Sequence, residues 1–190
     1  AGLIIASEEI VNALFGYGSF KAEDVKLTSK ALMYFGFGIP AFAIIKIFAN
    51  LFFARHNTET PFHVSLVVVL INVFISLIFF KSIGFIIIPI ATSISAWVGA
   101  TIYVFLLIGR KYLIFKKDNI INALKIILST ILMSVALLLV LEHFNSQLIY
   151  SNSFKFIYVL FIVLSLAMFY LLLCNLMGIL KNKKDNNYQV

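Results

Sequence analysis

Charged residues and cysteine are both scarce in this sequence of 190 residues. Charged side chains make up 12% of it, against roughly 25% in soluble domains. The single cysteine, Cys174, lies in an apolar run without a second thiol for a disulfide or a zinc site, so we expect it to pack among its neighbours. The apolar segments also lack a nucleophile with a nearby base, a phosphate-binding glycine loop and paired carboxylates. These absences argue against an enzyme, a metal site and a bound cofactor.

Hydrophobic residues dominate instead. They make up 62% of the chain, and the mean hydropathy is +1.05. The few polar residues cannot cover so much apolar surface, so the chain needs lipid as its solvent. The net charge of +7 comes from short basic clusters between apolar runs and not from one basic stripe, which favours membrane topology over a nucleic-acid partner.

Hydropathy divides the chain into the end of one helix and five complete membrane spans. Spanning about 30 Å of hydrocarbon takes roughly 20 apolar residues in a helix, which satisfies its own backbone hydrogen bonds. The sequence opens on an apolar stretch with no initiator methionine and no basic signal-peptide region, so we expect it to start within a helix. We predict an all-α, polytopic transmembrane helix bundle over residues 1–180, with segments at about 1–15, 27–54, 62–80, 84–108, 120–141 and 156–180.

Lysine and arginine in the loops predict the orientation, because an excess of them marks the cytoplasmic side. The loops form two alternating sets. The richer set holds Arg55, Arg110, Lys111, Lys116, Lys117, Lys181, Lys183 and Lys184. The poorer set holds Lys21, Lys26, Lys81 and, at its edge, Lys155. We therefore expect a cytoplasmic C-terminus, with residues 181–190 as a polar, disordered cytoplasmic tail.

Local chemistry refines two of the span boundaries. Thr60 and Pro61 read as a helix N-cap followed by proline at the first helical position, which would start the second complete span. The segment 110–117 mixes basic residues with Tyr112 and Phe115, which is typical of a segment lying against anionic headgroups. Either a lipid-specific site or the general positive-inside bias explains that segment.

Lys46 is the main candidate for a functional residue. It lies within the first complete span, where a charge costs at least about 2.5–3.5 kcal/mol on insertion scales. In the functional interpretation it faces a wet cavity and meets an anionic group of a substrate, such as a diphosphate. In the alternative interpretation its ammonium reaches the cytoplasmic interface near Ala54.

Gly36, Gly38 and Pro40 lie on the same predicted helix. Proline removes one backbone hydrogen bond, so a kink or hinge is expected there, as in the broken helices of transporters. Small residues also allow membrane helices to approach closely, so packing explains them equally well.

The third complete span carries a pattern of small residues, and we interpret it as a packing signal. It comprises Ala91, Ser95 and Gly99, with Ala96 and Ala100 alongside. Asn72 and Asn175 are isolated amides that we expect to form hydrogen bonds between helices. The last two spans are apolar almost all round, which predicts that they lie at the lipid-facing edge of the bundle.

Two stretches of the chain carry specific motifs: residues 14–24 read LFGYGSFKAED, and residues 52–61 read FFARHNTETP. The first stretch looks like the LF-x-x-G-x-F-x-x-x-D loop of the MurJ (MviN) family of lipid II flippases. Residues 52–61, FFARHNTETP, resemble its F-Y-A-R-Q-D-T-x-T-P signature, through Arg55, Asn57, Thr58, Thr60 and Pro61 in a cytoplasmic loop. Tyr34, Gly38, Pro40 and Lys46 fit the family's pattern between the two. Asn57 departs from the usual aspartate, and Asn50 stands where a proline is common.

The resemblance implies the C-terminal part of a fourteen-helix transporter of the multidrug/oligosaccharidyl-lipid/polysaccharide exporter superfamily, from the end of the ninth helix onward. It implies a flippase of the bacterial inner membrane that moves lipid II from the cytoplasmic to the periplasmic leaflet by alternating access, in cell wall biogenesis. Its expected partners are lipid II and membrane lipids, and its last two helices are associated with a groove for the undecaprenyl tail. Another exporter of the superfamily, for polysaccharide lipids or drugs, and a noncatalytic membrane scaffold are the alternatives.

Overall fold

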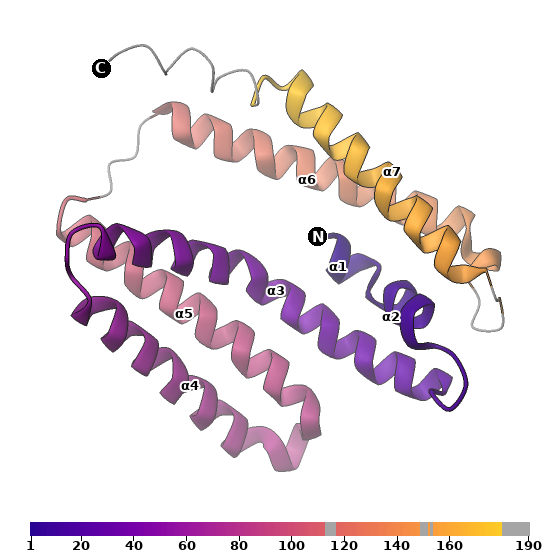
Figure 1. Cartoon of the computed structure of the whole chain (residues 1–190), viewed down its shortest axis with the longest axis horizontal. Coiled ribbons are helices and arrows are strands. Elements are labelled where there is room, and N and C mark those ends of the chain that lie inside the picture. The colour runs from indigo at the N-terminus through magenta and orange to yellow at the C-terminus, as the bar shows by residue number, and fades with distance from the viewer. Residues whose placement is uncertain (113–116, 149–151, 153, 180–190) are drawn as a thin grey trace. The chain divides into compact units, whose positions relative to one another are not determined.

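The computed structural model describes residues 1–112, 117–148, 152 and 154–179, and these residues form helices and turns but no strand. The predicted all-α class is confirmed. The predicted tail, 181–190, lies outside the described residues. The helices are α1 (Gly2–Ile5), α2 (Ser7–Phe15), α3 (Ala22–Phe53), α4 (Glu59–Ile83), α5 (Ile87–Gly109), α6 (Lys117–His143) and α7 (Lys155–Leu176), with 3₁₀ turns η1 (Gly84–Ile86) and η2 (Asn145–Gln147) (Figure 1).

Each of the five predicted spans overlaps one long helix, from α3 to α7. Four apolar segments in the described residues are long enough to cross a membrane, and one of them, Glu59–Gly109, has 51 residues and contains both α4 and α5. Gly84 turns the chain between these two helices with a φ of 74°, a left-handed conformation that glycine adopts without strain.

Two predictions about helix boundaries are wrong: the one for residues 1–15 and the one for the start of α4. The segment 1–15 is not one helix, because α1 and α2 are separated at Ala6. Helix α2 then starts with Glu8 and Glu9 in its first turn, where acidic side chains stabilise a helix N-terminus. Helix α4 begins at Glu59 and not after Thr60, so Pro61 lies in its first turn, where a missing N–H still costs no hydrogen bond.

Three helices end in the same backbone motif. After α3, α5 and α7 one residue adopts a positive φ: His56 at 57°, Lys111 at 55° and Gly178 at 73°. Around each of them, one N–H bonds the carbonyl three residues back and the next N–H bonds the carbonyl five residues back, which is the Schellman arrangement. The motif satisfies the last carbonyls of each helix and stops it sharply.

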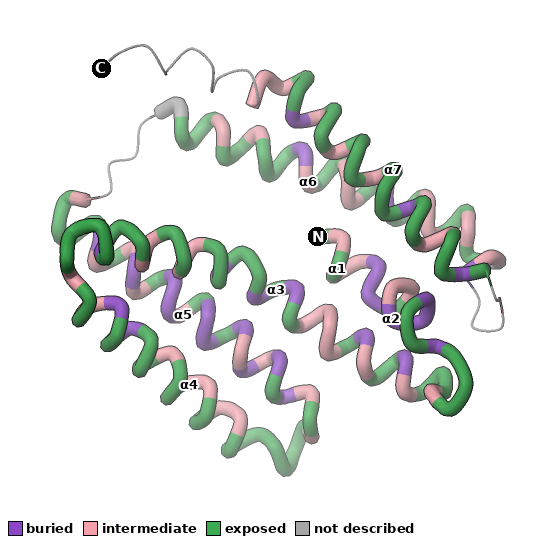
Figure 2. Tube along the Cα trace, in the orientation of Figure 1, coloured by how far each residue is buried: buried purple, intermediate pink, exposed green. Residues whose placement is uncertain are grey.

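The chain divides into two compact units, and each is described by itself. One unit comprises Ala1–Val25 and Phe115–Val190, and the other comprises Lys26–Ile114. In the second unit, α5 carries most of the buried positions, as the purple segments of Figure 2 show. All five small residues predicted to pack are buried, namely Ala91, Ser95, Ala96, Gly99 and Ala100. The packing prediction for this helix is therefore confirmed.

The first unit joins α1 and α2 to the helix pair α6 and α7. Its core consists of Ala6, Leu137, Leu148 and Ile162. Cys174 is buried on α7, as predicted. Many other apolar side chains of α6 and α7 are exposed, Leu176 to 82%. This pattern agrees with two helices that face lipid.

Candidate functional site

Glycines bring the helices of the second unit into close contact. A Cβ atom added at Gly38 of α3 would lie 2.8 Å from the Ser93 hydroxyl oxygen of α5. A Cβ atom added at Gly99 of α5 would lie 2.5 Å from Cγ2 of Val68 on α4 and 3.2 Å from Cδ1 of Ile45 on α3. A larger residue at either position would push two helices apart.

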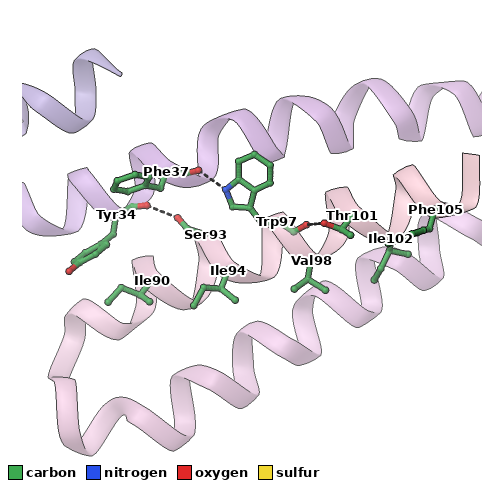
Figure 3. Close-up of a pocket in the computed structure, with 10 residues that line it drawn as sticks. All are labelled: Tyr34, Phe37, Ile90, Ser93, Ile94, Trp97, Val98, Thr101, Ile102 and Phe105. Atoms are coloured by element: carbon green, nitrogen blue, oxygen red, sulfur yellow. Dashed lines mark hydrogen bonds between the residues drawn. The ribbon is translucent and has the colours of Figure 1, made fainter. Parts of the chain in front are cut away.

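Side chains of α5 bond to the backbone of α3 in the two turns before Pro40. Helix α3 continues through this proline, which lacks an N–H and disturbs the carbonyls of the preceding turn. The Trp97 indole N–H donates to the Phe37 carbonyl at 2.9 Å, and the Ser93 hydroxyl donates to the Tyr34 carbonyl at 2.5 Å (Figure 3). These two hydrogen bonds hold the part of α3 that precedes Pro40 against α5. The hinge role of Gly36, Gly38 and Pro40 stays a prediction.

An apolar groove of about 650 Å³ lies along α3 and α5. Its lining is almost entirely hydrophobic, and Trp97 lies in the middle of it with its ring beside α3 (Figure 3). The lining residues are Tyr34, Phe37, Ile90, Ser93, Ile94, Trp97, Val98, Thr101, Ile102 and Phe105. A surface of this kind suits a hydrocarbon chain or an apolar helix, not a charged head group.

A small polar cluster links α4 to α5. The Asn72 amide donates to the Thr92 hydroxyl oxygen at 3.0 Å, and the Thr92 hydroxyl donates to the Ile88 carbonyl at 2.8 Å. Ser76 and Ser95 lie 3.5 Å from Asn72 atoms in the same cluster. The predicted interhelical bond of Asn72 is confirmed. Asn175 is exposed, and its side chain forms no hydrogen bond in the described part of α7.

Lys46 is exposed on α3 and does not line the groove between α3 and α5. It lies seven residues before Phe53, the last residue of the helix, which is about 10 Å along a helix axis. This position permits both contact with a substrate group and a side chain extended to the membrane interface. The cavity role of Lys46 stays a prediction.

The predicted cytoplasmic loop, with Arg55, Asn57, Thr58, Thr60 and Pro61, connects α3 to α4. The Asn57 side-chain oxygen accepts a hydrogen bond from the Thr60 N–H at 3.0 Å and so caps the start of α4. Thr58 precedes the helix, and Pro61 is buried in its first turn. The Thr60 hydroxyl accepts a hydrogen bond from Arg110 at 3.2 Å, which joins this loop to the end of α5. An asparagine caps as well as the usual aspartate, so this departure keeps the local structure.

A second apolar groove, of about 320 Å³, lies between α6 and α7 in the first unit. One hydroxyl, that of Ser165, interrupts an otherwise hydrocarbon and aromatic lining: Ala136, Val140, Phe144, Phe161, Ile162, Leu166 and Phe169. At one end of the pair, Lys125 of α6 donates to the Met177 carbonyl at 2.9 Å and so caps α7. The two helices are therefore held together around an apolar space.

Lys155, at the start of α7, is 1% exposed. Its ammonium donates to the Gly16 carbonyl at 2.6 Å and to the Asn12 side-chain oxygen at 3.0 Å, and it lies 4.2 Å from the centre of the Tyr17 ring. Lys155 lies at the edge of the poorer set of loop charges, as predicted, but its ammonium is buried against the loop that follows α2. It binds the C-terminal end of α2, where a helix favours a positive charge, and it anchors α7 there.

A polar pocket of about 220 Å³ lies beside this anchor. Glu8, Glu9, Asn12 and Asn145 contribute its polar side chains. One oxygen of the Glu9 carboxylate is buried without a hydrogen-bond partner in the described residues. No pattern in the sequence predicted that these carboxylates would face a pocket.

Comparison with known proteins settles the family. The model of the family described as lipid II flippase MurJ matches residues 1–161. The chain belongs to the MurJ family. A MurJ chain is a multi-pass protein of the bacterial inner membrane, and its family is one of transporters.

Individual MurJ proteins match most of this chain. The probable lipid II flippase MurJ of Rickettsia prowazekii is 30% identical over 151 residues, which cover 80% of this chain and 30% of that protein. The lipid II flippase MurJ of Thermosipho africanus is 33% identical over 134 residues, which cover 70% of this chain and 26% of that protein. A solved structure of lipid II flippase MurJ in an inward closed conformation is 28% identical, with a TM-score of 0.71 over 93% of this chain and 34% of that chain. The chain thus spans about a third of the length of its MurJ relatives.

Proposed function

We propose that this chain forms the last helices of a lipid II flippase, which moves the lipid-linked peptidoglycan precursor from the cytoplasmic to the periplasmic leaflet by alternating access. Membership of the MurJ family carries the proposal. The apolar groove between α6 and α7 supports it, because such a substrate has a long hydrocarbon tail that must stay in an apolar environment while its head group crosses.

The groove between α6 and α7 is the proposed site of the undecaprenyl tail. Ala136 and Ser165 are its two smallest lining residues, so a tryptophan at either position would fill it. In the full-length protein, Ala136→Trp should reduce flipping while the protein still reaches the membrane. Leu164→Trp is the matched control, because Leu164 is 57% exposed and does not line the groove. Equal flipping activity of Ala136→Trp and Leu164→Trp would show that the groove between α6 and α7 does not bind the tail.

Lys46 is the proposed contact for the diphosphate of the substrate. A compact positive charge within a membrane span is costly, which favours a functional reason for it. Lys46→Ala in the full-length protein should impair complementation of a flippase-deficient strain, and Lys46→Arg should retain more activity. Lys30→Ala removes the same charge from an exposed position of the same helix and should complement normally. Normal growth with Lys46→Ala would leave only the interpretation in which the side chain extends to the interface.

We further propose that the C-terminus and the ends of α3 and α5 face the cytoplasm. Arg55, Arg110 and Lys111 gather at these helix ends, as the positive-inside rule requires. A Cys174→Ala background allows single cysteines at His56 and at Ser82, both exposed, to be labelled with a membrane-impermeant maleimide. Ser82→Cys should react in intact cells, and His56→Cys only after the inner membrane is opened. The opposite order would invert the topology.

Two other functions remain as alternatives within this proposal. Another exporter of the superfamily would move a polysaccharide lipid or a drug, and a scaffold would move nothing. Depletion of the full-length protein separates the three. Lipid II that accumulates on the cytoplasmic face supports flipping, whereas normal delivery of lipid II to the periplasm supports an alternative.

A further inference from the structure

Two arginines lie over neighbouring aromatic rings at the end of the second unit where α3 and α5 end. The guanidinium carbon of Arg55 is 3.6 Å from the centre of the Tyr112 ring, and that of Arg110 is 5.2 Å from the centre of the Phe52 ring. The two rings are themselves in contact, with their centres 6.3 Å apart. Phe52 is fully buried, so this aromatic pair is a rigid support for both cations.

These arginines do not act as the lysines of the first unit do. Lys125 and Lys155 bond carbonyls at helix ends, and this contact accounts for their charge. Arg55 and Arg110 lie at helix ends as well, but neither donates to a carbonyl in the residues that the structure describes. Hydrogen bonding to the last carbonyls of a helix therefore does not explain why Arg55 and Arg110 lie where they do.

Most of the donors of the two side chains remain available. A guanidinium has five N–H groups in a planar fork. Arg110 uses one of them, for the Thr60 hydroxyl, and Arg55 uses none within the described part of the chain. Neither arginine is paired with a carboxylate there, and both are exposed. Two forks stacked on rings that touch each other, neither paired with a carboxylate in the described residues, match the oxygen atoms of a phosphate group, which arginine binds in a bidentate manner.

The surroundings favour a lipid over a soluble anion. Phe53, in the last turn of α3, is 49% exposed, and Phe62, in the first turn of α4, is 65% exposed. Phe53 lies two residues before Arg55, and Phe62 lies two residues after Thr60, which binds Arg110, so a ligand there would meet a cationic and a hydrocarbon surface together. We propose that Arg55 and Arg110 form a binding site for the phosphate of an anionic diacyl phospholipid in the adjoining leaflet. The site does not depend on the proposed flipping activity.

Native mass spectrometry of the full chain in a nonionic detergent tests the site. Phosphatidylglycerol and phosphatidylcholine are added separately, and the affinity of the first bound lipid is compared. A basic residue near a membrane surface contributes about 1 kcal/mol to attraction of anionic lipid, which is about fivefold in affinity. The double variant Arg55→Gln/Arg110→Gln should therefore bind phosphatidylglycerol on the order of 20-fold more weakly, with little change for phosphatidylcholine. Lys81→Gln, which removes one exposed charge near the end of α4, should change neither affinity by more than about twofold.

Two further variants distinguish specific binding of the phosphate from general attraction of anionic lipid to positive charge. Arg55→Lys/Arg110→Lys keeps both charges but loses the planar forks, and Tyr112→Leu keeps both arginines but removes one supporting ring. Both should lose at least about fivefold in affinity for phosphatidylglycerol, with helix content and thermal unfolding unchanged. Unchanged affinity in the lysine variant, or an equal loss in Lys81→Gln, would overturn the proposal. Complete displacement of the lipid by excess inorganic phosphate at constant ionic strength would also overturn it, because the site would then be one for the soluble ion.

Discussion

Gly99→Ala should destabilise the second unit, although alanine is the better helix former. An added Cβ would lie 2.5 Å from Cγ2 of Val68 and 3.2 Å from Cδ1 of Ile45, on two different helices. Valine has a stiff χ1, so its methyl group cannot turn aside cheaply. Overpacking of this kind costs about 1–3 kcal/mol, whereas replacing glycine by alanine in a helix gains about 0.5–1 kcal/mol. The net expectation is a loss of up to about 2.5 kcal/mol.

Gly109→Ala is the matched control, because Gly109 belongs to the same helix and nothing lies within 4 Å of a Cβ added there. It should leave stability unchanged or raise it by up to about 1 kcal/mol. The chain of 190 residues is unfolded in mixed micelles with increasing dodecyl sulfate, and the fluorescence of Trp97, the only tryptophan in this sequence, reports on α5. Gly99→Ala/Val68→Ala should recover part of the loss. If Gly99→Ala is as stable as Gly109→Ala, the close packing of α5 against α4 and α3 is refuted.

The remaining predictions concern single contacts. Asn57→Ala should destabilise the start of α4 by about 0.5–2 kcal/mol, because it removes the acceptor for the Thr60 N–H. Asn57→Asp keeps an acceptor and should not destabilise it. The midpoints of unfolding of the two variants test this difference. Lys155→Met should expose the link after α2 to protease, because it leaves the carbonyl of Gly16 unpaired, while Lys81→Met should not; equal cleavage of both variants would contradict the anchor. Trp97→Phe should cost about 1 kcal/mol through its lost bond to α3, and an unchanged unfolding midpoint would count against it.

Hydropathy and residue size predicted the helices and the packing stripe well, because both depend on local properties of the chain. Ala91, Ser95 and Gly99 recur every four residues, so they must share one face of a helix whatever it packs against. The partner of that face, which includes Val68 and Ile45, is not encoded in the same stretch. The sequence therefore predicted that α5 packs closely but not against which side chains.

Contacts between distant positions were not predictable in this way. Lys155 bonds Gly16, which is 139 residues away, and Trp97 bonds Phe37, which is 60 residues away. A lysine at the border of an apolar segment resembles a loop charge until its partner is known. The α4 cap shows the same limit at short range, since Asn57, Thr58 and Thr60 are all good capping residues and only the backbone selects Asn57.

The central proposal, that this chain belongs to a working lipid II flippase, is tested most directly by measuring the leaflet that holds lipid II. Cells depleted of their own flippase receive the full-length protein, and an externally added enzyme then digests lipid II that has reached the periplasmic leaflet. Complemented cells should show digestion at the level of undepleted cells, and cells with Ala136→Trp should show less. If lipid II stays protected in complemented cells although the protein is present in the inner membrane, the proposal is contradicted.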